Sequence, residues 1–350
     1  MPRALLIVLI AVVILAAGWV LQLLWVAGQF KTLEPHFGGS CARIEGVVGA
    51  EDLTIHPRTG VAYLTAYDRR AAAAGRPPRG ALYAYDLKAS PPSFVNLTPD
   101  AAPGFRPHGL SLYAAPDGRD ALFVVNHAGG RHTVEVYDLV DGRLSHRETL
   151  ADPLLVSPND LVAVDPRRFY TSNDHGSPEG FGRTLEEYLR LPLANVVYYD
   201  GERFSEAAAG VRMGNGINLS SDGRTLYLAA TVGRSVRVYD RDPASGALAL
   251  RQEIPIGSGG DNIEVDADGA LWIGAHAKLL DFVAHSSDPS RRAPSQVLRI
   301  SERADAGWVV DEIYLDLGDQ FSGSSVAAVR GERLLVGAVY DAGILDCRMR

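Results

Sequence analysis

The sequence predicts an all-β fold, a β-propeller, preceded by one N-terminal transmembrane helix. A long apolar run near the N-terminus predicts the helix, and short apolar runs separated by Gly, Pro, Asp and Asn after about residue 40 predict strands. The order of these runs also repeats, which a β-sandwich, the alternative for short strands, does not explain. We therefore expect an anchor over residues 1–30 and a single propeller domain over residues 31–350.

The N-terminal apolar run covers residues 4–26 and contains no charged side chain. A helix of this length reaches about 34 Å, enough to cross a hydrocarbon core of about 30 Å. Arg3 precedes the run, so we expect a cytoplasmic N-terminus and a propeller on the periplasmic or extracellular side. A cleaved signal peptide is the alternative, but its apolar region is normally shorter, about 7–15 residues.

The propeller prediction depends on a repeated order of turns and strands. Residues 218–240 read as a polar turn, Asp-Gly, an apolar strand, Gly, and a strand that ends in Val-Tyr-Asp. Residues 108–138 have the same order, and an interval of roughly 50 residues per four-stranded unit is typical of propeller blades. The expected strands include residues 62–64, 81–85, 121–125, 134–137, 225–228, 236–239 and 271–273.

One segment departs from the strand pattern. Residues 183–193 predict a short helix with Thr184 as the N-cap and Glu187 completing a capping box. A helix inserted among propeller strands is a candidate wall of a pocket.

Charge and cysteine usage restrict the compartment and the partners. The net charge of -8 provides no broad basic field, so we expect no nucleic-acid partner. The two cysteines, Cys41 and Cys347, lie at opposite ends of the expected propeller. Outside the cytoplasm such a pair can form a disulfide that ties the start of the fold to its end. The alternative is two unrelated buried thiols.

Oxygen-bearing side chains recur just before several apolar runs. Calcium takes six to eight oxygen ligands, whereas zinc prefers His and Cys at close spacing, a pattern that this sequence lacks. Each pair alone more often caps a turn, but equivalent positions of propeller blades converge on one central channel. The recurrence therefore predicts a calcium-binding channel. The residues are Glu51-Asp52, Asn159-Asp160, Asn215 and Asp261-Asn262.

Two histidines are candidates for acid–base chemistry. His108 and His127 lie at the two ends of one expected hairpin. A histidine backed by a second one can act as a general base toward water, because its ordinary pKa is about 6.5. A purely structural histidine is the alternative. His276 follows a strand in a comparable place, and His175 lies in Asn-Asp-His.

Taken together, these segments resemble the signature segments of the paraoxonase (serum arylesterase/lactonase) family, in the same order and at similar spacing. The resemblance runs from about Cys41 to Cys347 and implies a six-bladed propeller with two calcium ions per chain in its channel. The segments that carry it are residues 49–53, 107–110, 124–127, 159–164, 172–175, 197–199, 215–218 and 261–263.

The resemblance also implies a role for each candidate residue. The catalytic ion would be held by Glu51, Asn159, Asn215, Asp261 and Asn262. The deeper, structural ion would be held by Asp52, Asp160 and the main-chain carbonyl of Leu110. The water-activating pair would be His108 and His127, the further pocket histidine His276, and the terminal disulfide Cys41–Cys347.

The activity that the resemblance implies is calcium-dependent hydrolysis of lactones and aryl esters. The metal would polarise the carbonyl, and a histidine would activate the attacking water. Acyl-homoserine lactones and organophosphates stay open as substrates. The loop of residues 68–79 lacks the aromatic residue expected of the family's active-site flap. A non-catalytic, calcium-stabilised propeller that acts as a binding module is the alternative from another class.

Overall fold

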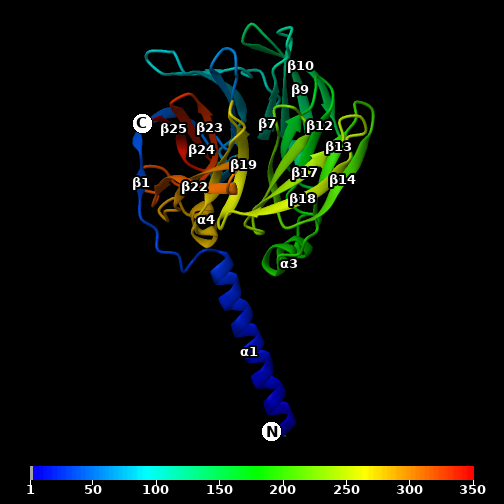
Figure 1. The fold of residues 1–350 in the computed structure, drawn as a ribbon, viewed down its shortest axis with the longest axis vertical. Helices are drawn as coiled ribbons and strands as arrows, with labels where there is room; N and C mark the ends of the chain where they lie inside the picture. The colour runs from blue at the N-terminus through cyan, green and yellow to red at the C-terminus, as the bar shows by residue number, and fades with distance from the viewer. Residues whose placement is uncertain (1–2) are drawn as a thin grey trace.

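The computed structural model describes residues 3–350, and the strands in this range form six antiparallel sheets arranged as a propeller (Figure 1). Each sheet contains four blade strands, and a short strand, β1 (His36–Phe37), extends the outer edge of one of them. The first strand of each blade contacts the first strands of its neighbours around the ring. The predicted six-bladed propeller is confirmed.

The blades follow one another along the chain. Blade 1 contains β3 (Leu53–Ile55), β4 (Val61–Ala66), β5 (Ala81–Asp86) and β6 (Phe94–Asn96). Blade 2 contains β7 (Pro107–Tyr113), β8 (Asp120–Asn126), β9 (Thr133–Val140) and β10 (Arg143–Leu150). Blade 3 contains β11 (Pro158–Ala163), β12 (Phe169–Asn173), β13 (Ala194–Tyr199) and β14 (Phe204–Val211).

The second half of the ring repeats this order. Blade 4 contains β15 (Gly214–Leu219), β16 (Thr225–Ala230), β17 (Ser235–Arg241) and β18 (Leu248–Pro255). Blade 5 contains β19 (Gly259–Val265), β20 (Leu271–His276), β21 (Ser295–Arg303) and β22 (Gly307–Asp316). Blade 6 contains β23 (Ser324–Arg330), β24 (Arg333–Ala338), β25 (Ala342–Met349) and the N-terminal strand β2 (Gly39–Val48).

The hydrophobic core lies between neighbouring blades. Strands β8 and β20 are buried along their whole length, because adjacent blades cover both of their faces. One apolar cluster joins Val236 and Val238 of blade 4 to Ile263 and Ile273 of blade 5. The outer strand β10 instead has mostly exposed side chains. Packing of this kind fixes the inner strands, and therefore the side chains that project into the channel.

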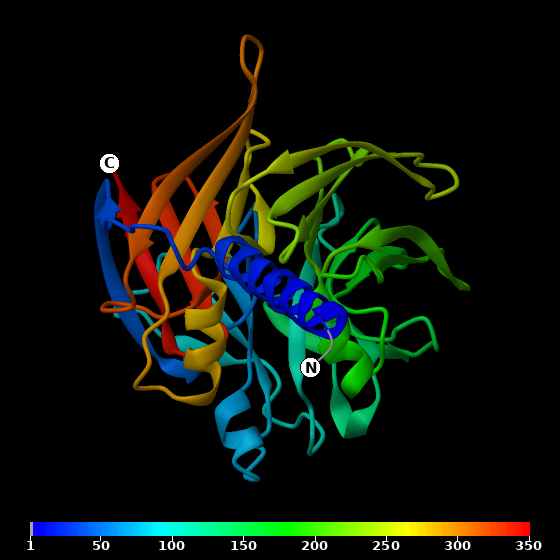
Figure 2. The same cartoon turned by 90° about the horizontal axis from the view of Figure 1, so that it is seen from below.

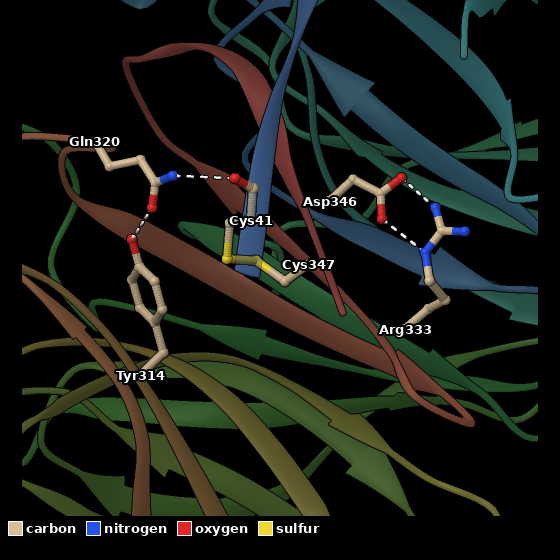
Figure 3. The surroundings of a disulfide bond; sticks show 6 residues. All are labelled: Cys41, Tyr314, Gln320, Arg333, Asp346 and Cys347. Atoms are coloured by element: carbon tan, nitrogen blue, oxygen red, sulfur yellow. Dashed lines mark hydrogen bonds and ion pairs between the residues drawn. A yellow bond between two sulfur atoms is a disulfide. The ribbon is translucent and has the colours of Figure 1, made fainter. Parts of the chain in front are cut away.

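The N-terminal strand closes the ring. Strand β2 pairs with β25, and Cys41 lies directly opposite Cys347 in this pairing. The two residues form a disulfide across 306 residues of sequence, as predicted (Figure 3). Asp346, next to Cys347, accepts two hydrogen bonds from the guanidinium of Arg333. The covalent link and the strand pairing therefore hold the same edge of blade 6.

Helices lie on one face of the propeller. They are α1 (Arg3–Val26), α2 (Arg69–Ala73), α3 (Phe181–Leu189) and α4 (Leu279–Ser287), with a 3₁₀ turn, η1 (Ala128–Gly130). Helix α1 leaves the face that also carries α3 and α4, and its long axis projects away from the blades (Figures 1 and 2). It is long and apolar enough to cross a membrane, a property that a signal sequence shares.

The predicted start of the inserted helix is wrong. Helix α3 begins at Phe181 after an N-cap at Gly180, whose φ of 127° is open to glycine and unfavourable for other residues. Thr184 lies inside the helix, where its hydroxyl turns back toward the carbonyl of Gly180 at 3.5 Å. Glu187 pairs with His175 at 3.0 Å instead of completing a capping box.

Candidate active site

A cavity of about 370 Å³ opens on the face from which α1 departs. Its polar lining comes from blades 1 to 5, and its apolar lining comes largely from α4 and the end of α1. The polar lining residues include Glu51, Arg69, His108, Asn159, Asp174, Asn215, Asp261 and His276. The structure thus brings together residues as far apart in the sequence as Glu51 and His276.

A recurring irregularity in the inner strands places the oxygen-bearing residues. The pairing with the second strand shifts register between Pro158 and Leu161 in β11, and between Gly214 and Ile217 in β15. Strand β19 shifts at the equivalent point, between Gly260 and Ile263. Bulges of this kind release residues from the ladder and re-aim their side chains. The residues released are Asn159, Asp160, Asn215, Gly216, Asp261 and Asn262.

Several side-chain oxygens of the candidate calcium ligands (the ring of oxygens) are buried without a hydrogen-bond partner. They are Glu51 Oε2, Asn159 Oδ1, Asn215 Oδ1 and Asn262 Oδ1. Each such group costs about 1–3 kcal/mol when it is left unpaired. All four are hard oxygen donors, which is the ligand chemistry of calcium. In the described chain no three His, Cys, Asp or Glu side chains form a metal cluster by themselves, so a metal here would depend on the Asn oxygens.

Buried negative charge accompanies these oxygens. Burial, followed by the nearby charge of Asp261, raises the pKa of Glu51 to about 7. The Nδ2 of Asn262 donates to Glu51 Oε1 at 2.8 Å and partly offsets this effect. A divalent cation would favour the ionised carboxylate. The charge and the donor set therefore both fit calcium.

Two aspartates lie one residue further along the inner strands and bridge neighbouring blades. Asp52 accepts hydrogen bonds from the amides of Leu53 at 2.8 Å and Leu110 at 2.7 Å. Asp160 accepts from the amides of Leu161 and Ile217, at 2.7 and 2.9 Å. Burial raises the pKa of both carboxyl groups well above the usual range, and the charge of Glu51 adds to the effect on Asp52 as the charge of Asp52 does on Asp160. Leu110 thus lies beside Asp52 through its amide, while the role expected of its carbonyl stays a prediction.

A further carboxylate shares this channel and was not predicted. Glu264 of β19 accepts a hydrogen bond from Thr54 Oγ1 of β3 at 2.8 Å. Burial, followed by the charge of Asp52, raises the pKa of Glu264 to about 8. Glu264 lies two residues after Asn262 in the regularly paired part of β19, where the sequence shows only strand alternation and no mark of a functional residue.

The two candidate catalytic histidines are in contact. His108 Nδ1 lies 2.8 Å from His127 Nε2, and His108 Nε2 lies 3.6 Å from Glu51 Oε1. A third histidine extends the series, because His127 Nδ1 lies 2.7 Å from His132 Nδ1. No sequence pattern indicated His132, which approaches His127 through the turn after β8.

Burial keeps the histidine series, which consists of His108, His127 and His132, in the unprotonated form. It lowers the pKa of His108 well below the usual value, with Arg69 and His127 adding to the effect. It also lowers the pKa of His127 to about 3, helped by His132. These imidazoles are therefore neutral at neutral pH, so each ring has one nitrogen that can accept a hydrogen bond and one that can donate one.

Two other histidines hold the walls of the cavity. His276 Nε2 lies 2.9 Å from Asp261 Oδ2, and its ring stacks on Phe282 of α4 with centroids 3.8 Å apart. His175 contacts Asp174 at 2.7 Å and Glu187 of α3 at 3.0 Å. Burial disfavours the charged His175 ring, but the two carboxylates outweigh it and raise its pKa to about 9.

Comparison with known proteins identifies the family. The arylesterase family profile matches residues 33–349. The chain belongs to the arylesterase family. Serum paraoxonase/arylesterase 2 of Rattus norvegicus is 33% identical over 317 residues, which are 87% of this chain and 88% of that protein. Serum paraoxonase/arylesterase 1 of Homo sapiens is 31% identical over 311 residues, 86% of each chain. The chain is therefore an ester and lactone hydrolase, which confirms the enzyme class predicted from the resemblance.

Solved structures that resemble this arylesterase share its fold. A luciferin-regenerating enzyme matches with a TM-score of 0.56 and 14% identity, covering 89% of this chain and 95% of its own. A calcium-binding regucalcin from Agrobacterium tumefaciens matches with a TM-score of 0.54 and 15% identity, covering 91% and 98%. At these identities the likeness shows the propeller alone.

Proposed function

We propose that this arylesterase hydrolyses lactones and aryl esters in a calcium-dependent reaction at the channel mouth, with two calcium ions per chain. The observation that carries the proposal is the ring of buried, unpartnered oxygens beside His108 in one cavity. The proposed ligands of the catalytic ion are Glu51, Asn159, Asn215, Asp261 and Asn262. The proposed ligands of the deeper ion are Asp52, Asp160 and the carbonyl of Leu110. A bound calcium ion would polarise the substrate carbonyl and stabilise the negative charge that develops on its oxygen.

In this proposal the chain's own residues handle the proton. His108 donates its Nδ1 hydrogen to His127 Nε2, which leaves His108 Nε2 free to accept a proton from the attacking water. The water oxygen forms the bond to the carbonyl carbon, and the imidazolium then returns the proton to the leaving oxygen. Glu51 Oε1, 3.6 Å from His108 Nε2, stabilises the imidazolium between these steps.

The serines near the site do not offer a competing nucleophile. The sequence contains no Gly-x-Ser-x-Gly. Ser172 and Ser325 contact the ring, but both are fully buried and donate to main-chain carbonyls, Ser172 to that of Asn215 at 2.6 Å and Ser325 to that of Glu51 at 2.5 Å. These contacts give both serines a structural role, which supports direct attack by water.

We also propose that α1 anchors the enzyme in a membrane, with a cytoplasmic N-terminus and the propeller on the periplasmic or extracellular side. The length and composition of α1 support an anchor. The Cys41–Cys347 disulfide supports an oxidising compartment for the propeller. N-terminal sequencing of membrane-extracted protein tests this proposal, because a mature chain that starts after residue 18 contradicts it.

A substrate panel measured with and without a calcium chelator tests the proposed activity. We expect turnover of lactones or aryl esters that disappears on chelation and returns with calcium, but not with magnesium. The alternative, a calcium-stabilised binding module, predicts no turnover of any ester or lactone in the panel while thermal stability still depends on calcium. Turnover that survives complete removal of calcium would contradict the proposed metal role.

A further inference from the structure

The last turn of α1 is docked on the propeller. The carbonyl of Ala27, directly after the helix, accepts a hydrogen bond from the amide of Leu279 at the start of α4, at 2.9 Å. The guanidinium of Arg234 lies over the Trp25 ring, 5.1 Å from its centroid. Lys31 Nζ then donates to Ser258 Oγ at 2.8 Å. Contacts with two different blades thus fix the end of the helix relative to the channel.

Glycine is required where the chain leaves this turn. Gly28 has a φ of 74°, and a Cβ at this position would lie 2.2 Å from the carbonyl oxygen of Ala277. The backbone therefore approaches the loop after β20 more closely than any other residue permits. Val26 and Ala27 are 6% and 4% exposed, whereas Leu9, in the N-terminal half of α1, is 52% exposed. The helix consequently has a docked end and a free body.

The docked end lines the same cavity as the proposed catalytic residues. Leu23, Val26 and Ala27 share it with His108 and Glu51. Phe282 and Val283 of α4 line it as well. The cavity therefore has a polar floor at the inner strands and an apolar wall that the anchor helps to build.

We propose that the last turn of α1 is part of the substrate-binding site and contacts the apolar acyl or alkyl portion of the ester or lactone. The inference rests on the proposed function, which places the reacting carbonyl at the polar floor. A carbonyl at His108 leaves the rest of the substrate to extend toward Leu23 and Val26, because these side chains line the same cavity. The segment that anchors the enzyme thereby also sets the chain length of the substrate that it accepts.

The test compares 4-nitrophenyl esters from acetate to decanoate, using the full-length protein in detergent micelles. Each buried methylene group contributes about fourfold to binding. We expect the decanoate-to-acetate ratio of kcat/KM to fall at least about tenfold in Leu23→Ala/Val26→Ala. The matched control, Leu9→Ala/Val12→Ala, removes the same two kinds of side chain at the same spacing from the exposed body of the helix and should keep the wild-type ratio.

A second variant tests the inference by narrowing the cavity, whereas the alanine variant enlarges it. Leu23→Phe adds bulk to the wall and should shift the best substrate to a shorter acyl chain. A wild-type chain-length profile in both active variants would overturn the inference while leaving the proposed function intact. Absence of turnover by the wild-type protein would instead contradict the proposed function, and with it the inference.

Discussion

His108→Gln removes the proposed base while keeping a polar side chain of similar reach. The 2.8 Å contact with His127 and the 3.6 Å contact with Glu51 show that one ring nitrogen is held by the series and the other faces the ring of oxygens. General-base catalysis contributes about 10²–10⁴-fold to a rate. Lactone turnover should therefore fall by that factor, an increase of about 2.7–5.4 kcal/mol in the activation free energy.

The assay measures kcat for a lactone and for a phosphotriester on the same preparation, with bound calcium quantified. Phosphotriester hydrolysis has a good leaving group, so its rate should fall less than the lactone rate. Calcium content should stay at the wild-type value, because His108 is not a proposed ligand. If lactone turnover stays within a few-fold of wild type, His108 is not the base, and Glu51 becomes the better candidate.

Three further predictions concern the frame around the site. Asp160→Asn should lower the melting temperature and reduce the further fall that a calcium chelator causes, since each bound ion stabilises the folded state by mass action and only the catalytic ion is left to remove. Cys347→Ser should lower the free energy of unfolding by about 2–5 kcal/mol in denaturant titrations, and an equal Cm would contradict a structural role for the disulfide. Because the folded-state pKa of His175 is raised to about 9, its ion pairs should stabilise α3 fully below about pH 6.5 and be lost as the pH rises through about 9. The protection factors of the α3 amides, which correct for the intrinsic base-catalysed rise of exchange with pH, should therefore fall across this window in the wild type and show no such step in His175→Gln.

The sequence was sufficient for the propeller because its signal is local and repeated. Asp-Gly turns recur in blades 2 to 5 and short apolar runs in every blade, and residues 225–228 and 236–239 lie inside β16 and β17 as expected. Ring closure by Cys41 and Cys347 was also predictable, since residues at the two ends of a propeller meet in its last blade.

The remaining site features depend on tertiary contacts that have no periodic signal. The start of α3 was misplaced because Thr184 fits a capping pattern, whereas the backbone enters the helix at Gly180, where a positive φ is needed. His132 joins the histidine series only through the conformation of the turn after β8. Helix α4 was not predicted from the sequence. Its apolar residues are accounted for only by the cavity that the helix covers in the folded chain, where Phe282 stacks on His276.

A calcium count on purified variants tests the central claim most directly. The wild-type protein, dialysed against calcium and measured by elemental analysis, should contain two ions per chain. The Asn215 side chain is a proposed ligand of the catalytic ion only. The Asn215→Ala protein should therefore keep one ion, retain its fold by circular dichroism, and lose lactone and aryl-ester turnover. Two ions and wild-type turnover in Asn215→Ala, or full activity in wild-type protein that contains no calcium, would contradict the account.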